Sequence, residues 1–345
     1  MIGSFRPPNA TLERRRAPMD RSRRCFLRGV AAAALAARSA RALRLSGETF
    51  FTWERLGEGV WSAHAPGFGG ASLLIAGSER ALLVDAGKAP VGDALRREAW
   101  DLCRLPIDAV NTHHHSEQTG GNHAFTPDRT VWAHARATPR VLAQLNLYIA
   151  QSKDAVAPLS RLAATPIVDA VRKEAREYYA RVHSIRVFEF CPTSAIEARA
   201  EMDLGGLRVE VKPIGPAHTD NDLVVLVPER RVAHVGDLAG PGVHPYFDAD
   251  GGADMDGWAR ALATLGEWCP EGWTLVSGDR ARFGPDGIEA QSRYFEAVRS
   301  LVERAIGEGK SRREVRALVP EGFEEWRNPT NLVVLLGALY DRARR

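Results

Sequence analysis

Three consecutive histidines, residues 113–115, lie in the segment of this sequence that is richest in metal-binding residue types. The run 107–111 just before them predicts a buried strand. Side chains two residues apart on a strand point to the same side, so His113 and His115 can both turn onto one ion. Neutral imidazole suits Zn²⁺ or Fe²⁺. Taken alone, the segment is also compatible with three surface histidines in a loop.

Further ligand-type residues follow this histidine segment and recur at other predicted strand ends. Glu117 lies in the next turn, where its carboxylate can reach a second ion beside the first. Four more such residues each lie close to a glycine at the end or start of a strand: Asp85, His218, Asp237 and Asp279. This recurrence favours a metal site over a cluster of surface histidines.

The elements that must position these residues form two similar sets, each a run of strands with a helix. The first set consists of strands 50–53, 60–63, 72–76, 81–84, 107–111 and 131–133 and helix 91–103. The second consists of strands 195–198, 207–214, 222–227, 231–235 and 273–276 and helix 255–265. Two mixed sheets packed face to face, with helices on both outer faces, accommodate this α+β pattern. We expect a single domain over 43–345.

Two helical segments lie outside these sets. Residues 135–183 are rich in Ala, Arg and Leu, contain no Gly, and predict two or three helices inserted on the scaffold. Residues 286–345 predict a helical extension with helices at 286–307 and 330–344. Ser311 and Glu314 have the spacing of a capping box for a further helix between them.

The order and spacing of these segments over about 50–285 resemble the metallo-β-lactamase superfamily, whose fold is an αββα sandwich. The resemblance implies three ligands of a first metal ion: His113, His115 and His218. It implies that Asp237 is a bridging ligand. It also implies supporting roles for Asp85, which would steady the histidine loop, and for Asp222.

The sequence departs from the usual pattern of that family at the second metal site. Glu117 and Gln118 stand where the family motif HxHxDH has Asp-His, and Asp279 stands where a terminal histidine ligand is usual. The cysteine ligand of one β-lactamase subgroup is absent, since Asp237 occupies the comparable strand end. The first site is therefore intact, whereas the second is rebuilt from oxygen ligands.

The second site is either altered and occupied or lost, which leaves one or two divalent ions. Glu117, Asp237 and Asp279 carry three negative charges, and a bridging hydroxide would balance two divalent ions. We expect Zn²⁺ at the first site and Zn²⁺, Mn²⁺ or Fe²⁺ at the second, because oxygen ligands favour the harder ions. Gln118 contributes a carbonyl oxygen or a hydrogen bond. His114 points away from its neighbours and is interpreted as a supporting residue.

The segment after Asp237 is interpreted as part of the substrate pocket, because related proteins shape their pockets there. Its candidate pocket residues are His244, Tyr246 and Phe247, and an ordinary loop is the alternative. The expected function is hydrolysis of a small ester, thioester, lactam, phosphoester or sulfoester. A metal-activated hydroxide would be the nucleophile, and Glu117 would orient it and shuttle its proton.

Two other functions remain open on the same fold. One is a mononuclear iron dioxygenase acting on persulfides, for which His113, His218 and Asp237 supply the ligand pattern. The other is a non-catalytic binding protein that a metal ion stabilises. Metal analysis separates them: two ions support the hydrolase, one iron the dioxygenase, and one zinc without turnover the binding protein.

Charge is distributed unevenly along the 345 residues, whose net charge is +3. Residues 1–42 hold ten arginines and two acidic side chains, so 36 basic and 41 acidic side chains remain in the rest. The body is mildly acidic, which argues against a nucleic-acid partner.

Residues 1–42 have the form of a leader that is cleaved after export. Arg23 and Arg24 lie in a twin-arginine motif over 22–28, and an Ala-rich run over 29–37 follows. That run is shorter than the ~20 residues of a membrane span. The small residues Ala40 and Ala42 form a cleavage site. We expect a bacterial periplasmic protein without a membrane span after cleavage, and a basic tail before a helix is the alternative.

Replacing Arg23 and Arg24 together with lysine tests this leader. We expect the precursor to stay in the cytoplasm, because the forked guanidinium is not mimicked by an ammonium group. Immunoblots of periplasmic and cytoplasmic fractions measure the outcome. Normal periplasmic accumulation of the double variant would show that the segment is not a twin-arginine signal.

Overall fold

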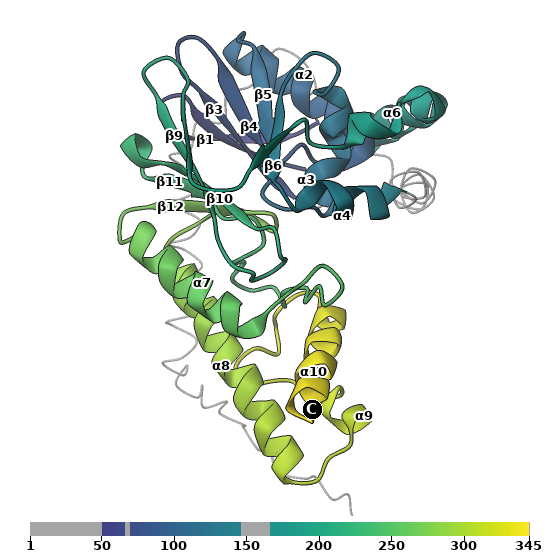
Figure 1. Ribbon diagram of the computed structural model, residues 1–345, viewed down its shortest axis with the longest axis vertical. Helices are drawn as coiled ribbons and strands as arrows, with labels where there is room; N and C mark the ends of the chain where they lie inside the picture. The colour runs from purple at the N-terminus through teal and green to yellow at the C-terminus, as the bar shows by residue number, and fades with distance from the viewer. Residues whose placement is uncertain (1–49, 66–69, 146–165, 345) are drawn as a thin grey trace, which may run out of the picture. The chain divides into compact units, whose positions relative to one another are not determined.

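The computed structural model describes residues 50–65, 70–145 and 166–344. These residues belong to one compact unit built around two β-sheets (Figure 1). The first sheet has its strands in chain order: β1 (Thr52–Gly57), β2 (Val60–His64), β3 (Ala71–Ala76), β4 (Ala81–Val84), β5 (Ile107–Val110), β6 (Val131–His134) and β7 (Ser194–Ile196). Neighbours up to β4 are antiparallel, and those from β4 to β7 are parallel.

The second sheet contains six strands. Their spatial order is β13 (Arg280–Phe283), β12 (Thr274–Ser277), β11 (Val232–His234), β10 (Leu223–Val227), β9 (Arg208–Pro213) and β8 (Ala200–Asp203). The neighbours β11 and β12 are parallel, and the other pairs are antiparallel. Both sheets are therefore mixed.

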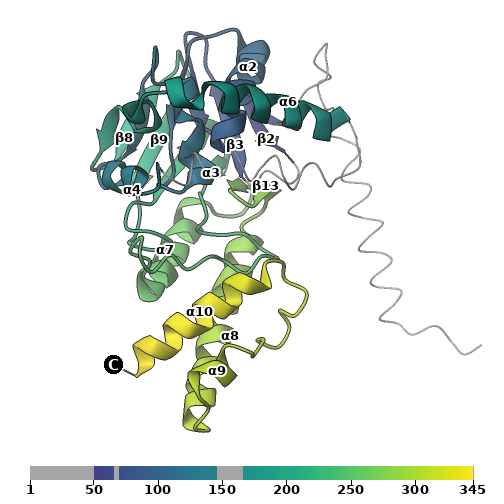
Figure 2. The same ribbon diagram turned by 90° about the vertical axis from the view of Figure 1, so that its right-hand side faces the viewer.

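Helices cover the outer faces of both sheets. The helix α2 (Gly92–Cys103) packs on the first sheet, and α7 (Met255–Trp268) packs on the second. The helix α8 (Asp286–Gly307) lies against α7, and α10 (Pro329–Ala343) lies against α8 (Figure 2). The other α-helices are α3 (Ser116–Thr119), α4 (Ala137–Ala143), α6 (Pro166–Arg181) and α9 (Arg312–Val315). Single 3-10 turns are η1 (Ala89–Val91), η2 (Gly120–Ala124), η3 (Val182–Ser184), η4 (Val187–Phe190) and η5 (Pro228–Arg230).

Three apolar layers hold this arrangement together. The middle layer joins the facing sides of the two sheets, with Leu73 and Val84 from one and Val211 and Val225 from the other. The outer layers contain Leu95 of α2 on the first sheet and Trp258 of α7 on the second. Because alternate side chains of each strand enter different layers, the order is helix, sheet, sheet, helix. The predicted α+β sandwich is confirmed.

Two strands were not predicted from the sequence. The prediction at 195–198 covers only β7, and β8 follows after a short break. The alternation of exposed and half-buried residues in β8 gives little hydrophobic contrast. The second missed strand, β13, contains two arginines in four residues and returns directly from the turn after β12. Both are edge strands of the second sheet, where burial demands little of the sequence.

The structure describes part of the predicted helical insertion and the predicted C-terminal extension up to residue 344. In the insertion predicted at 135–183, α4, α6 and η3 are described, while residues 146–165 lie outside the described part. The extension from 286 contains α8, α9 and α10, and the capping box of Ser311 and Glu314 is present. The predicted leader at 1–42 also lies outside the described residues.

Among the described helices, none combines the length and the apolar character that crossing a bilayer requires.

Candidate metal centre

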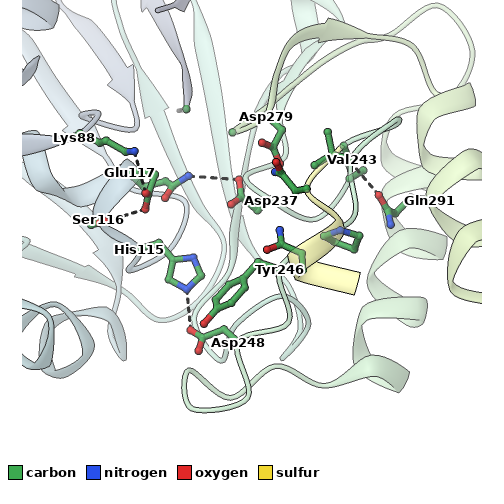
Figure 3. Close-up of a pocket in the computed structure, with 18 of the residues that line it drawn as sticks. Lys88, His115, Ser116, Glu117, Asp237, Val243, Tyr246, Asp248, Asp279 and Gln291 are labelled. Atoms are coloured by element: carbon green, nitrogen blue, oxygen red, sulfur yellow. Dashed lines mark hydrogen bonds and ion pairs between the residues drawn. The ribbon is translucent and has the colours of Figure 1, made fainter. Parts of the chain in front are cut away.

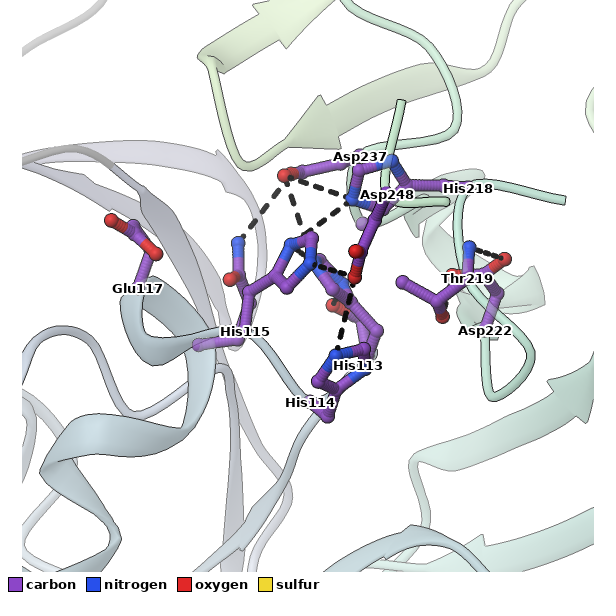
Figure 4. Close-up of polar contacts among 12 residues, drawn as sticks. His113, His114, His115, Glu117, His218, Thr219, Asp222, Asp237 and Asp248 are labelled. Atoms are coloured by element: carbon purple, nitrogen blue, oxygen red, sulfur yellow. Dashed lines mark hydrogen bonds and ion pairs between the residues drawn. The ribbon is translucent and has the colours of Figure 1, made fainter. Parts of the chain in front are cut away.

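Four predicted ligands come together where strands of both sheets end. The Nδ1 atom of His115 lies 3.1 Å from Nε2 of His113 and 3.2 Å from Nε2 of His218. An oxygen of Asp237 lies 3.6 Å from Nε2 of His113 and 3.7 Å from Nε2 of His218. Figure 4 shows the three rings and this carboxylate turned toward one another.

The position of His113 is fixed by the ends of two parallel strands. Asp85 follows β4 in the left-handed region, with φ 62°, and its carboxylate accepts hydrogen bonds from the Thr112 amide at 2.7 Å and hydroxyl at 2.9 Å. Because the hydroxyl donates to Asp85, it can accept from Nδ1 of His113, 3.0 Å away. The Nε2 lone pair of His113 then faces the cluster.

His218 is held in the turn between β9 and β10 by a second buried carboxylate. Asp222 accepts hydrogen bonds from the amide of Thr219 at 2.9 Å and from its hydroxyl at 2.7 Å. The next amide, that of Leu223, donates to the carbonyl of Thr112 at 2.7 Å. This bond ties the start of β10 to the histidine loop after β5, so that the two ligand segments lie side by side.

Burial determines the protonation of these groups. Burial, followed by the nearby charge of His115, lowers the pKa of His113 and of His218 well below the usual range. Both rings are therefore neutral near pH 7, which metal binding requires. Burial raises the pKa of Asp85 and of Asp222 to about 7, even though their hydrogen bonds to threonine oppose this shift.

Asp237 follows β11 and faces a second carboxylate. Burial, followed by the charge of Asp279, raises the pKa of Asp237 well above its usual range. The amide of Gln118 donates to Asp237 at 3.4 Å. A Cβ atom at Gly278 would lie 2.0 Å from the Asp237 carboxylate, so glycine is required at this position. A cation here would relieve the repulsion between the two carboxylates.

The donor set therefore fits a divalent metal ion. Three imidazole nitrogens and one carboxylate oxygen are the ligand types that bind Zn²⁺ and related ions.

Glu117 and Asp279 lie outside this four-residue cluster. Glu117 is in α3, where its carboxylate accepts from the Ser116 hydroxyl at 2.8 Å and pairs with Lys88 at 3.4 Å. Asp279 is an exposed residue in the turn between β12 and β13. Both line a cavity of about 420 Å³ together with His115 (Figure 3). The structure thus brings them to one cavity without joining them to the histidines.

The three predicted pocket residues take different positions. Tyr246 lines the cavity, with its ring centroid 5.7 Å from that of His115. His244 is buried, and its Nδ1 lies 2.9 Å from the hydroxyl of Tyr294. Phe247 is buried in the apolar layer under α7 and α8. Of the three predicted pocket residues, Tyr246 therefore faces the cavity, whereas His244 and Phe247 are buried in the interior.

Several cavity residues were missed by the sequence analysis. Asp248 follows the predicted pocket residues directly, and it contacts both His114 and His115. Burial opposes its ionisation, but the hydrogen bonds from these two rings outweigh burial and hold its pKa well below the usual range. The C-terminal helices supply Gln291, Asn328 and Asn331 to the far side of the cavity. No spacing rule links such distant amides to a metal motif.

Comparison with known proteins supports the fold described above. Residues 65–267 match the model of the family described as the metallo-beta-lactamase superfamily. A metallo-beta-lactamase from Pontibacter korlensis is 17% identical with a TM-score of 0.50, covering 71% of this chain and 99% of that chain. FIM-1 from Pseudomonas aeruginosa, in its mono-zinc form, is also 17% identical with a TM-score of 0.50, covering 71% and 95%. These similarities show a shared fold. A search of curated proteins found no match.

The variant His218→Ala tests the ligand assignment. We expect Zn²⁺ affinity to fall by more than about 100-fold, because two imidazoles and one carboxylate leave the ion open to water. His113→Ala is expected to behave alike. Competition with a chromophoric chelator measures the affinity, and elemental analysis measures the metal content. The matched control is His183→Ala, which removes an exposed histidine that is not one of the four proposed ligands. Wild-type metal content in either ligand variant would contradict the assignment.

Proposed function

This chain is a metallohydrolase of the metallo-β-lactamase superfamily, and from that premise we propose the chemistry of its site. The ion is held by His113, His115, His218 and Asp237. The observation that carries the proposal is that Nδ1 of His115 lies within 3.2 Å of Nε2 of both His113 and His218. The proposed reaction is hydrolysis of an ester, thioester, lactam, phosphoester or sulfoester of a small molecule.

A divalent ion at such a site makes bound water a nucleophile near neutral pH and polarises a carbonyl or phosphoryl oxygen. The cavity residues would then orient the reactants. Burial opposes ionisation of Glu117, but Lys88 and the Ser116 hydroxyl outweigh it and lower its pKa. A carboxylate that stays ionised orients a water molecule by accepting its hydrogen bond, and is a weak base for the proton. We assign Glu117 this orienting role.

The participation of His115 favours the hydrolase over the persulfide dioxygenase. The dioxygenase pattern uses His113, His218 and Asp237 and leaves His115 without a role. In the structure, Nδ1 of His115 is the nitrogen closest to both other imidazoles. A site with three histidine donors is typical of hydrolytic zinc centres. We therefore propose Zn²⁺ at the first site.

Metal-dependent turnover tests this function. We expect protein loaded with Zn²⁺, Mn²⁺ or Fe²⁺ to hydrolyse at least one member of a panel of generic esters, thioesters, lactams, phosphodiesters and sulfate esters. Chelation should abolish the activity, and His218→Ala should lower it by more than about 100-fold. A single bound iron with oxygen consumption on a persulfide would instead support the dioxygenase. Bound zinc without any turnover would support a binding protein.

We further propose a second ion beside the first, held by Asp237, Asp279 and Glu117. Two observations support it. Burial and, after it, the charge of Asp279 raise the pKa of Asp237, and a second cation would oppose both effects. The side-chain amide nitrogen of Gln118 donates to Asp237, and the buried Oε1 of the same amide, which has no hydrogen-bond partner among the described residues, is available as an additional oxygen ligand. A single ion at the histidine cluster is the alternative.

Variants of Asp279 test the second ion. Asp279→Ala should lower the metal content from two ions to about one, because the remaining carboxylates cannot enclose a second hard ion. Asp279→His should keep two ions and shift the preference toward Zn²⁺. Elemental analysis after loading with each metal gives both results. Glu271→Ala, which removes an exposed carboxylate elsewhere, is the control. Unchanged metal number and identity in both variants would show that Asp279 is not a ligand.

We also propose that the protein acts in the bacterial periplasm after twin-arginine export. The proposal is supported by Arg23 and Arg24 in their motif and by the small residues that follow. Export of a folded protein would allow the metal to bind before the chain crosses the membrane.

A further inference from the structure

Asp248 lies behind the histidine cluster and contacts two of its rings. One carboxylate oxygen, Oδ2, lies 2.8 Å from Nε2 of His115 and 3.3 Å from Nε2 of His114. The other oxygen, Oδ1, accepts a hydrogen bond from the amide of Gly251 at 2.9 Å. Asp248 is 7% exposed, so both interactions lie in a poorly solvated environment. Figure 4 shows the carboxylate between the two rings.

The tautomer of His114 follows from its other neighbours. Asn221 places its Nδ2 2.8 Å from a carboxylate oxygen of Asp220, which can only accept, so this atom is the amide nitrogen. The same nitrogen lies 2.9 Å from Nδ1 of His114. Nδ1 therefore accepts, and the ring proton of His114 is on Nε2. His114 thus donates to Asp248 and has no lone pair there for a metal ion.

The same carboxylate oxygen fixes the tautomer of His115. Because the carboxylate oxygen 2.8 Å from Nε2 of His115 is a hydrogen-bond acceptor, this ring nitrogen carries the proton that points to it. The lone pair of His115 is then on Nδ1, the atom that lies 3.1 Å from His113 and 3.2 Å from His218. A carboxylate on the far side of a ligating imidazole also increases its basicity.

We propose that Asp248 is a positioning residue that fixes the tautomer and the ring orientation of His115 and so determines the affinity of the metal site. This inference rests on the proposed metal site, but not on the identity of the substrate.

The turn that contains Asp248 holds its carboxylate against the rings of His114 and His115. A Cβ atom at Gly251 would lie 1.8 Å from Oδ2 of Asp248 and 2.9 Å from a ring carbon of His114. Arg140 of α4 holds the neighbouring segments together, since it pairs with Asp220 at 2.7 Å and donates to the carbonyl of Asp250. The carboxylate therefore has little freedom to leave the rings.

Two variants disrupt the contact between Asp248 and the two histidine rings in different ways. Asp248→Asn removes the charge, and its amide cannot accept from both the imidazoles and the Gly251 amide, because one of its two polar atoms is a donor. Gly251→Ala keeps the charge and pushes the carboxylate away from the rings. The control, Asp250→Asn, removes one charge from an exposed position on the same turn.

The experiment measures Zn²⁺ affinity by competition with a chromophoric chelator and metal content by elemental analysis. We expect Asp248→Asn and Gly251→Ala to bind 10- to 100-fold more weakly, at unchanged stoichiometry, and Asp250→Asn to match the wild type. The visible absorption of Co²⁺-loaded protein should change in the first two variants, because the geometry at His115 changes. Thermal unfolding of the metal-free variants confirms that they fold.

Three results would overturn the inference. Wild-type affinity in folded Asp248→Asn would show that the carboxylate does not tune His115. Loss of one ion per chain, with the affinity of the other unchanged, would make Asp248 a ligand of a separate ion with His114 and His115. A wild-type protein that binds no metal would remove the proposed site itself, and this is distinguishable from failure at Asp248 alone.

Discussion

The structure depends on holding three imidazole nitrogens with their lone pairs facing one another. Nδ1 of His115 lies about as far from His113 and His218 as a hydrogen bond is long, yet burial keeps His113 and His218 neutral near pH 7. Lone pairs at such distances repel one another until a cation lies between them. The fold must therefore fix each ring from the side that faces away from the metal, which explains the position of the buried acids around the site.

Each ligand histidine has a carboxylate behind it or behind its neighbour in the chain. Asp85 acts on His113 through the hydroxyl of Thr112, and Asp222 holds Thr219 beside His218. Asp248 contacts His115 directly. These acids sit at strand ends and turns, where free backbone amides supply part of their hydrogen bonds. Burial alone would favour their neutral form, so the hydrogen bonds and a bound cation both stabilise the ionised form.

The sequence predicts a site residue best where the residue type and its place next to a strand are enough to indicate metal binding. Asp or His next to a glycine at the end or start of a strand predicted the positions of Asp85, His218 and Asp237. Hydrophobic patterning predicted both sheets apart from the edge strands β8 and β13. Spacing could not place Glu117, because its direction depends on pairing with Lys88 from another loop. It also could not distinguish Asp248 from a turn residue, since the two rings that Asp248 joins lie 133 and 134 positions earlier in the chain.

The cavity is lined both by residues within the family match and by residues that follow it in the chain. The family match ends at residue 267, whereas Gln291, Asn328 and Asn331 line the far side of the cavity. The same extension also holds the turn that carries the metal-supporting acid, because Arg327 pairs with Val243 and the amide of Asn331 donates to the carbonyl of His244 at 3.0 Å. The C-terminal extension therefore both lines the cavity and contacts the segment that leads to Asp248. A change in the C-terminal helices would alter both the shape of the cavity and the hold of Asp248 on the metal site.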